Sequence, residues 1–169
     1  MQTFNLSANI ENGFAKGMQY IVTPNAQNVV NNLINGFKTG IHSYTIIGTY
    51  GTGKSSFLLA LEADLDKKNR SKYLLNPKLL SECTEFEILN IVGDYADLSV
   101  LLGRKLNREG SSNSVLDELK VYYQRLAKDN KFLLLVIDEF GKVLEHAAKN
   151  NPEQELYFLQ YFGKFLPIN

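Results

Sequence analysis

The sequence has a single cysteine, no net charge and no long hydrophobic run. Cys83 has no second cysteine to pair with, so an internal disulfide is excluded and nothing points to an oxidising compartment. Eighteen basic and eighteen acidic residues cancel, which argues against a generic polyanion-binding surface. The N-terminus lacks the pattern of a signal peptide, and the longest strongly apolar run, Phe132 to Ile137, is too short to cross a bilayer. These absences predict a cytoplasmic protein without membrane contact, whose charge does not support nucleic acid as a partner.

The overall composition is that of a folded domain. The chain has 169 residues, of which 44% are hydrophobic and 21% charged, enough to bury a sizeable core. Residues 1–19 are polar, glycine-dotted and without periodicity, and we expect them to form an N-terminal arm. Residues 20–169 are expected to form one domain.

Apolar residues recur with the helical period in several segments. Thr23-Pro24 combines a helix N-cap with a first-turn proline, and the apolar residues that follow lie on one helical face, with Gly40 as the stop. Ser114 with Asp117 resembles a capping box that starts a second helix. The helices expected are thus one from Pro24 through Phe37 that stops at Gly40, Lys54 to about Leu65, Ser114 to about Leu126 and Pro152 to Phe162, with residues 94–106 ambiguous.

Three segments have the composition of β-strands. They are Ser43–Ile47, Glu85–Val92 and Phe132–Ile137. The third is apolar at successive positions, as expected of a strand that is covered on both faces in a parallel sheet. Because strands alternate with helices, the chain is predicted to be α/β, with βαβ units and a mostly parallel sheet.

A glycine-rich segment lies between the first predicted strand and the helix at Lys54. Residues 48–55, GTYGTGKS, satisfy the pattern G-x-x-x-x-G-K-[ST] at every fixed position. Glycines let the backbone N–H groups turn inward around a phosphate, and the following helix contributes the positive end of its dipole. Lys54 can reach the β- and γ-phosphates, and the Ser55 hydroxyl can bind Mg²⁺. The predicted nucleotide-binding residues are Gly48, Thr49, Tyr50, Gly51, Thr52, Gly53, Lys54, Ser55 and Ser56.

A second motif, Val136-Ile137-Asp138-Glu139, ends the apolar strand with two acidic residues. Open α/β sheets bind their ligands at the carboxyl ends of the strands. Asp138 is therefore predicted to hold Mg²⁺ through its water shell. Glu139 is predicted to orient or deprotonate a water for attack on the γ-phosphate, which makes Glu139 and Lys54 the candidate catalytic residues.

Together the two motifs resemble the Walker A and Walker B elements of P-loop ATPases. The chain is most similar to the N-terminal half of AAA+ and related STAND ATPases, over roughly residues 20–166, and the resemblance is specific only at the two motifs. It implies a three-layer P-loop NTPase fold with a mostly parallel central sheet and flanking helices, and it implies Mg²⁺ and ATP as cofactors. In this family a segment before the first strand helps to hold adenine, which would make Tyr20, Ile21, Val22 and Pro24 base contacts; core and cap roles are the alternative.

The resemblance is incomplete at the C-terminal end. The sequence ends at Asn169 without the later strand that carries a polar sensor residue and without the helical lid. We therefore expect the front part of a larger ATPase, whose C-terminal remainder and other subunits would be its partners. An arginine finger is not assigned, because Arg104 and Arg108 match solvated surface better. His42 and His146 lack metal-ligand spacing and are interpreted as structural or surface residues.

Two functions remain open from the sequence. The first is an ATPase module whose hydrolysis cycle drives a conformational change in a larger protein, with DNA-related or defence-related roles by analogy alone. The second is a nucleotide-gated signalling module with little hydrolysis. A GTPase is a further alternative, because Asp138-Glu139-Phe140-Gly141 satisfies D-x-x-G, although the long segment between the motifs and the acid after Asp138 count against it. An ABC ATPase is disfavoured, because its L-S-G-G-Q signature is missing before the second motif.

Overall fold

In the computed structural model the chain divides into two compact units. The first unit is Met1–Glu85 and the second is Phe86–Asn169, and each is considered by itself. The described residues are 10–11, 13, 20–66, 73–75, 85–107, 110–150 and 152–165. Most of the expected N-terminal arm, Cys83 and Arg108 thus lie outside the described residues.

The first unit begins with the predicted helix, α1 (Pro24–Lys38). The Thr23 side chain accepts a hydrogen bond from the Ala26 N–H (3.2 Å), and Pro24 occupies the first helical position. The helix ends at Thr39 and is followed by Gly40 in the left-handed region (φ +88°), the usual place for a terminating glycine. The predicted start, proline and stop are all confirmed.

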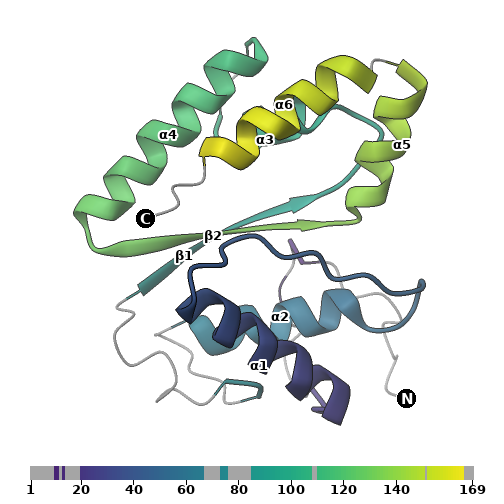
Figure 1. Ribbon diagram of the computed structural model, residues 1–169, viewed down its shortest axis with the longest axis vertical. Coiled ribbons are helices and arrows are strands. Elements are labelled where there is room, and N and C mark those ends of the chain that lie inside the picture. Colours follow the sequence, from purple (N-terminus) through teal and green to yellow (C-terminus); the bar gives the residue numbers. More distant parts are fainter. Residues whose placement is uncertain are drawn as a thin grey trace. The chain divides into compact units, whose positions relative to one another are not determined.

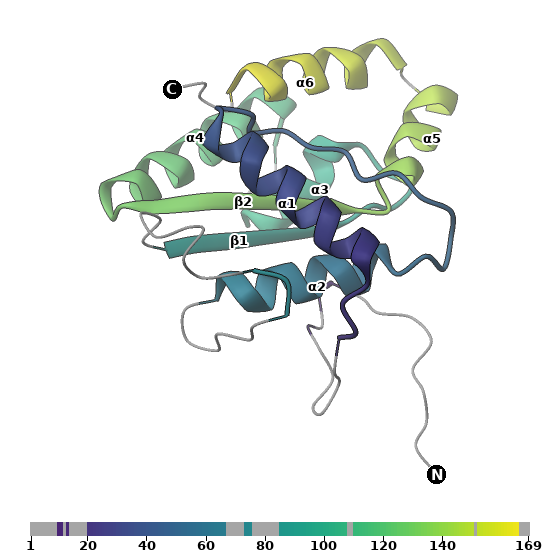
Figure 2. The same ribbon diagram turned by 60° about the horizontal axis from the view of Figure 1, so that its bottom comes forward.

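Helix α2 (Lys54–Leu65) has the bounds that were expected, and it packs against α1 (Figures 1 and 2). Val30 of α1 and Ala60 of α2 are completely buried in the small core that the two helices share. Residues 73–75 cover one end of this core, because the Asp64 carboxylate accepts hydrogen bonds from their three backbone N–H groups at 2.6–2.8 Å. In the described part of this unit, the helix pair and residues 73–75 therefore provide all the fully buried residues of the shared core.

The prediction of a strand at Ser43–Ile47 is wrong. Residues 41–49 have no regular secondary structure, and Ile47 is 90% exposed. The reason lies in Tyr44, whose hydroxyl is 2.9 Å from the Leu33 carbonyl oxygen of α1 and 2.6 Å from that of Ile41. These contacts hold the segment against the end of α1, and only Ile46 packs on the core of the unit. Local β propensity was overridden by this tertiary contact.

The second unit contains a two-stranded sheet of β1 (Glu85–Val92) and β2 (Lys131–Asp138). The arrows in Figure 1 run in the same direction, so the pair is parallel as predicted. Odd-numbered residues of both strands, such as Ile91 and Leu135, share the face that meets the core. The fold class α/β is thus confirmed, and the described residues contain two of the three predicted strands.

The described residues of this unit also form four helices: α3 (Leu98–Lys105), α4 (Ser112–Lys128), α5 (Phe140–Asn150) and α6 (Pro152–Phe165). Figure 1 shows α3, α4 and α6 on one side of the strands, and their apolar residues form the main core with Ile91. Helix α6 begins at Pro152 as predicted, whereas α5 was not predicted. Among the described residues no helix is long and apolar enough to span a bilayer.

The start of α4 differs from the prediction. The helix begins at Ser112 with Ser111 as its N-cap residue, whose φ of −68° and ψ of 159° are extended. The Ser114 hydroxyl does not cap the helix, because it donates a hydrogen bond back to the Ser111 carbonyl oxygen (2.7 Å). The predicted capping box therefore lies inside the first turn.

Candidate functional site

The predicted phosphate loop is a sharply bent segment that leads directly into α2. Gly51 and Gly53 have φ values of +79° and +83°, which side chains on L-residues disfavour. Gly53 is the N-cap residue of α2, so the positive end of this helix faces the loop. Of the two glycines that the motif fixes, Gly53 thus has a conformation that requires glycine and Gly48 does not; Gly51, at a variable position of the motif, has one as well.

The Lys54 side chain folds back into the loop. Its ammonium Nζ donates hydrogen bonds to the carbonyl oxygens of Gly48 and Thr49, both at 2.9 Å. The Thr52 hydroxyl donates to the Thr49 carbonyl oxygen as well (2.8 Å). A positive charge therefore lies within the bend, next to the start of α2, where an anion would be stabilised.

The remaining loop residues differ in exposure. Tyr50 is 93% exposed, while Ser55 and Ser56 are half-buried in the first turn of α2. A Cβ atom at Gly48 would lie 3.0 Å from the Thr52 hydroxyl, so this glycine also keeps the loop closed. The nine predicted nucleotide-binding residues, 48–56, are consecutive in the chain, and their role in nucleotide binding stays a prediction.

The residues that precede α1 were candidate base contacts. Tyr20 packs edge-on against Tyr73, with 6.3 Å between the ring centroids, and burial raises the pKa of its hydroxyl. Ile21 is 84% exposed, and Pro24 serves as the first residue of α1. Tyr20 and Pro24 thus have structural roles within the unit that holds the loop, and the base contact stays a prediction.

The acidic pair, Asp138 and Glu139, lies at the carboxyl end of β2 in the second unit. Asp138 is only 8% exposed, and its Oδ1 accepts a hydrogen bond from the Glu139 backbone N–H (2.9 Å). Glu139 has a φ of +54°, in the left-handed region. The other described non-glycine residues with positive φ are Asn107 and Asn130, which belong to the residue type that tolerates it. Glutamate does not, so position 139 is a strained one.

The Glu139 carboxylate forms an ion pair with Lys142, which lies in the first turn of α5. Lys142 Nζ lies 2.5 Å from Glu139 Oε2, and both side chains are partly exposed. The hydrogen bond to Glu139 raises the pKa of Lys142, and the nearby Asp94 carboxylate adds to the effect. Three charged groups from the ends of β1 and β2 and from α5 therefore gather at this edge of the sheet.

Sequence reasoning missed the residue that packs against the pair, Gly93. Its N–H donates a 2.7 Å hydrogen bond to the Asp138 carbonyl oxygen, so the end of β1 is joined to the end of β2. The sequence feature that could have indicated Gly93 is the Gly93-Asp94 dipeptide, which directly follows the predicted strand Glu85–Val92. In a parallel sheet such a residue lies at the same edge as the end of the neighbouring strand.

The two predicted magnesium ligands lie in different units and are both oxygen donors. Ser55 offers a hydroxyl in the first unit, and Asp138 offers a carboxylate in the second. Hard cations prefer such oxygen ligands, and Mg²⁺ usually keeps several waters and takes the rest from substrate phosphates. Among the described residues no three His, Cys, Asp or Glu side chains form a metal cluster. Each unit by itself thus offers one oxygen donor of the kind that Mg²⁺ takes, and a joint magnesium site stays a prediction.

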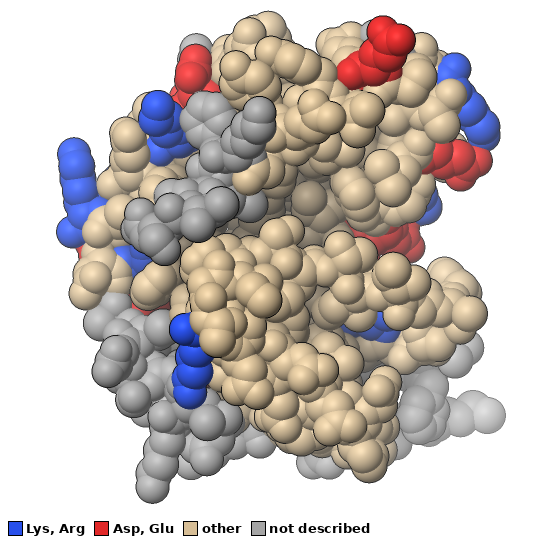
Figure 3. All heavy atoms as spheres, viewed as in Figure 1, with Lys and Arg blue, Asp and Glu red and all other residues tan. Residues whose placement is uncertain are grey.

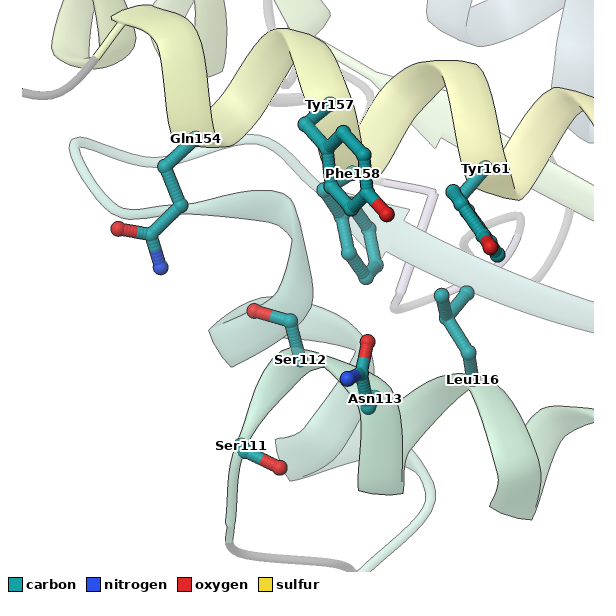
Figure 4. Close-up of a pocket in the computed structure, with 8 residues that line it drawn as sticks. All are labelled: Ser111, Ser112, Asn113, Leu116, Gln154, Tyr157, Phe158 and Tyr161. Carbon is teal, nitrogen blue, oxygen red and sulfur yellow. The ribbon is translucent and has the colours of Figure 1, made fainter.

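A separate cavity of about 270 Å³ opens in the second unit, between the start of α4 and α6. Figure 4 shows Tyr157 and Tyr161 of α6 facing Asn113 and Leu116 of α4. None of its lining residues is charged and none belongs to the predicted site, so it is unsuited to a triphosphate. The lining residues are Ser111, Ser112, Asn113, Leu116, Gln154, Tyr157, Phe158 and Tyr161.

The basic side chains on the face drawn in Figure 3 form no single patch among the described residues. Among the described residues visible in Figure 3, Lys and Arg stand apart from one another. Arg104 is exposed at the end of α3, in agreement with solvated surface. His42 packs edge-on against Phe37, and His146 Nδ1 lies 4.0 Å from Asp97 Oδ1, so both histidines have the structural or surface character that was expected.

Comparisons with protein-family models, with curated proteins and with solved structures found no match to this chain. The assignment of a function therefore depends on the chemistry of the two sites described above.

Proposed function

We propose that this chain is a P-loop ATPase module that binds Mg-ATP and hydrolyses it to drive a conformational change in a larger protein. The observation that carries the proposal is the loop at residues 48–55. Its two left-handed glycines, its internal Lys54 ammonium and the N-terminus of α2 form the combination that phosphate binding requires.

The acidic pair supplies the second half of the proposal. Ser55 and Asp138 would hold the magnesium ion, which when bound neutralises charge on the phosphates. Glu139 would accept a proton from, or orient, the attacking water. That the loop and the pair act on one nucleotide is itself part of the proposal, and it implies the larger three-layer, mostly parallel sheet of P-loop NTPases.

The proposed partners follow from the same assignment. The nucleotide and further subunits of a larger assembly would be the partners, and the sensor residues and the arginine finger stay unassigned. A DNA-related or defence-related role stays an analogy, because the balanced charge gives it no support.

One observation favours the alternative of a nucleotide-gated module with little hydrolysis. The Glu139 carboxylate is paired with Lys142, which competes with a catalytic water for the same oxygen atoms. A module of this kind would bind ATP through the loop with normal affinity and release phosphate only slowly. Binding and turnover must therefore be measured separately.

The direct test is Lys54→Ala, with ATP affinity measured by equilibrium titration in the presence of Mg²⁺. Loss of charge-assisted hydrogen bonds to the phosphates should weaken binding by about tenfold to hundredfold. Lys38→Ala is the matched control, since Lys38 is an exposed lysine of the same unit at the end of α1. Unchanged ATP affinity in Lys54→Ala would refute the phosphate-loop assignment.

Competition between ATP and GTP tests whether the chain prefers an adenine or a guanine nucleotide. The ATPase proposal predicts that unlabelled ATP displaces a bound fluorescent nucleotide at lower concentration than GTP does. The opposite order would replace it with the GTPase alternative.

A further inference from the structure

Gly93 occupies a position where a side chain has no room. A Cβ atom built on it would lie 2.8 Å from the Glu139 carbonyl carbon, 3.1 Å from the Asp138 carbonyl oxygen, and closer still to the Glu139 carbonyl oxygen. Real Cβ atoms essentially never approach backbone atoms so closely. The φ of Gly93 is not in the left-handed region, so glycine is required here by the close approach of two backbones and not by its own conformation.

The segment that carries Gly93 is fixed on both sides. On one side β1 is paired with β2, and the Gly93 N–H donates to the Asp138 carbonyl oxygen. On the other side the Tyr95 hydroxyl donates a 2.6 Å hydrogen bond to Glu145 of α5. Further along, Glu155 of α6 accepts a 2.9 Å hydrogen bond from the Leu98 N–H at the start of α3. The segment therefore cannot easily retreat from the Asp138–Glu139 peptide.

Glu139 is the part that would have to move. It already has a left-handed φ, and such a conformation persists only where the surroundings determine it. The surroundings are Gly93 on one side and the Asp138 carboxylate, which accepts the Glu139 N–H, on the other. Because the backbone at 139 sets the direction of its side chain, the contact at Gly93 also sets where the carboxylate points.

We propose that Gly93 is a positioning residue that holds the Asp138–Glu139 peptide, and with it the Glu139 carboxylate, in the geometry needed for hydrolysis. This inference rests on the proposed function, because it presumes that Glu139 acts on water. It adds a residue outside both sequence motifs, contributed by the strand next to β2.

The test is Gly93→Ala, with kcat and KM for ATP measured beside those of Gly141→Ala. Displacement of Glu139 by a fraction of an ångström should lower kcat by at least about tenfold while KM stays within about twofold. Gly141 is the matched control, since it lies two residues from Glu139 and a Cβ atom there meets nothing within 4 Å. An unchanged kcat in Gly93→Ala would overturn the proposal, and so would a loss of kcat and of ATP affinity in equal measure, which is the result of general damage.

A double variant strengthens the test. If Gly93 acts only through Glu139, then Gly93→Ala should lower kcat no further once Glu139→Gln is present. A further loss of about tenfold in the double variant would show that Gly93 acts by another route and would contradict the inference.

A spectroscopic readout separates this inference from the proposed function. In two-dimensional NMR spectra, Gly93→Ala should shift the amide signals of Asp138 and Glu139, and Gly163→Ala in α6, where a Cβ atom also has open space, should leave them in place. If the parent chain hydrolyses no ATP, the ATPase proposal fails, while these shifts still decide whether Gly93 positions the pair. Unmoved signals in Gly93→Ala would refute the positioning role.

If Gly93→Ala fails to fold, Tyr95→Phe tests whether the segment that carries Gly93 positions Glu139. It removes the Tyr95–Glu145 hydrogen bond at the surface without adding an atom to the turn, so kcat should fall by about twofold to fivefold with KM unchanged. Tyr157→Phe in α6, which removes another exposed tyrosine hydroxyl of the same unit, should have no effect. Equal kcat values for the two variants and the parent would then count against the proposal.

Discussion

The predicted phosphate loop (residues 48–55) and the acidic pair (Asp138 and Glu139) are built in opposite ways. The loop is exposed, with Tyr50 93% accessible, and it is closed by hydrogen bonds from its own Lys54 and Thr52 side chains. The pair is tied into a sheet: Asp138 is 8% accessible, and Gly93 of the neighbouring strand packs on its backbone. One site is formed by local glycine conformations, and the other by the pairing of distant segments.

This difference implies a division of labour. An exposed loop with a lysine ammonium inside its bend can bind an anion directly, so the loop is suited to provide affinity. A backbone that is fixed before any ligand arrives is suited to place a reacting group, because preorganisation removes the cost of orienting it during the reaction. Changes in the loop should therefore act mainly on binding, and changes around the pair mainly on turnover.

The largest expected effect is at Glu139. Glu139→Gln keeps the size of the side chain but removes the proton acceptor, so the rate of phosphate release should fall by about 10²-fold to 10⁴-fold. Glu153→Gln, an exposed glutamate in the first turn of α6, is the control and should keep the parent rate. A Glu139→Gln variant that hydrolyses ATP as fast as the parent would mean that Glu139 is not the base.

The loop is tested by comparing two left-handed glycines. Gly53→Ala and Gly40→Ala both place a Cβ atom at a φ above +80° in open space, so each should lower the free energy of unfolding by about 1–2 kcal/mol. Only Gly53→Ala should also weaken ATP binding, by about tenfold, because only Gly53 shapes the loop. Equal ATP affinities in the two variants, measured by titration, would remove the loop from the binding site.

The strain at Glu139 can be measured as stability. Glu139→Gly relieves the left-handed conformation, whereas Glu139→Ala retains a Cβ atom, so the glycine variant should be more stable by about 1 kcal/mol in denaturant unfolding. Asn130→Gly and Asn130→Ala give the same comparison in a turn remote from the pair (φ +58°). If Glu139→Ala proved the more stable of its pair, the backbone there would not be under strain.

The smallest expected effect is the pH dependence of folding stability that comes from Glu155 of α6. Burial raises the pKa of the Glu155 carboxyl above its ordinary value of 4.5; the Leu98 N–H opposes the shift, Asp97 adds to it and His146 reduces it. A raised pKa in the folded state means that this group favours folding below pH 4.5, and that the benefit is lost as the pH rises through the raised value.

Glu155→Gln removes this titration and keeps an oxygen that can accept the Leu98 N–H. Its thermal stability should therefore decline less than that of the parent between mildly acidic and neutral pH. A parent and variant with parallel stability curves over this range would contradict the assigned direction of the pKa shift.

The elements that could be predicted are those that local sequence determines. The start and end of α1, the bounds of α2 and the glycine conformations of the loop follow from residues adjacent in the chain. Ser43–Ile47 was mispredicted because the Tyr44 hydroxyl binds carbonyl oxygens at the end of α1, a contact that local β propensity does not contain. Gly93 was missed for the same kind of reason, since its close contact with Glu139 exists only once β1 and β2 are paired.

The division of labour is tested most directly by the ATP affinities of Lys54→Ala and Glu139→Gln, measured beside the parent in one titration series. We expect Lys54→Ala to bind ATP at least about tenfold more weakly, because it lacks the ammonium group that would form charge-assisted hydrogen bonds to phosphate. Glu139→Gln should bind within about twofold of the parent, because its role begins only at the chemical step. Parent-like affinity in Lys54→Ala, or equal weakening in both variants, would contradict this division of labour.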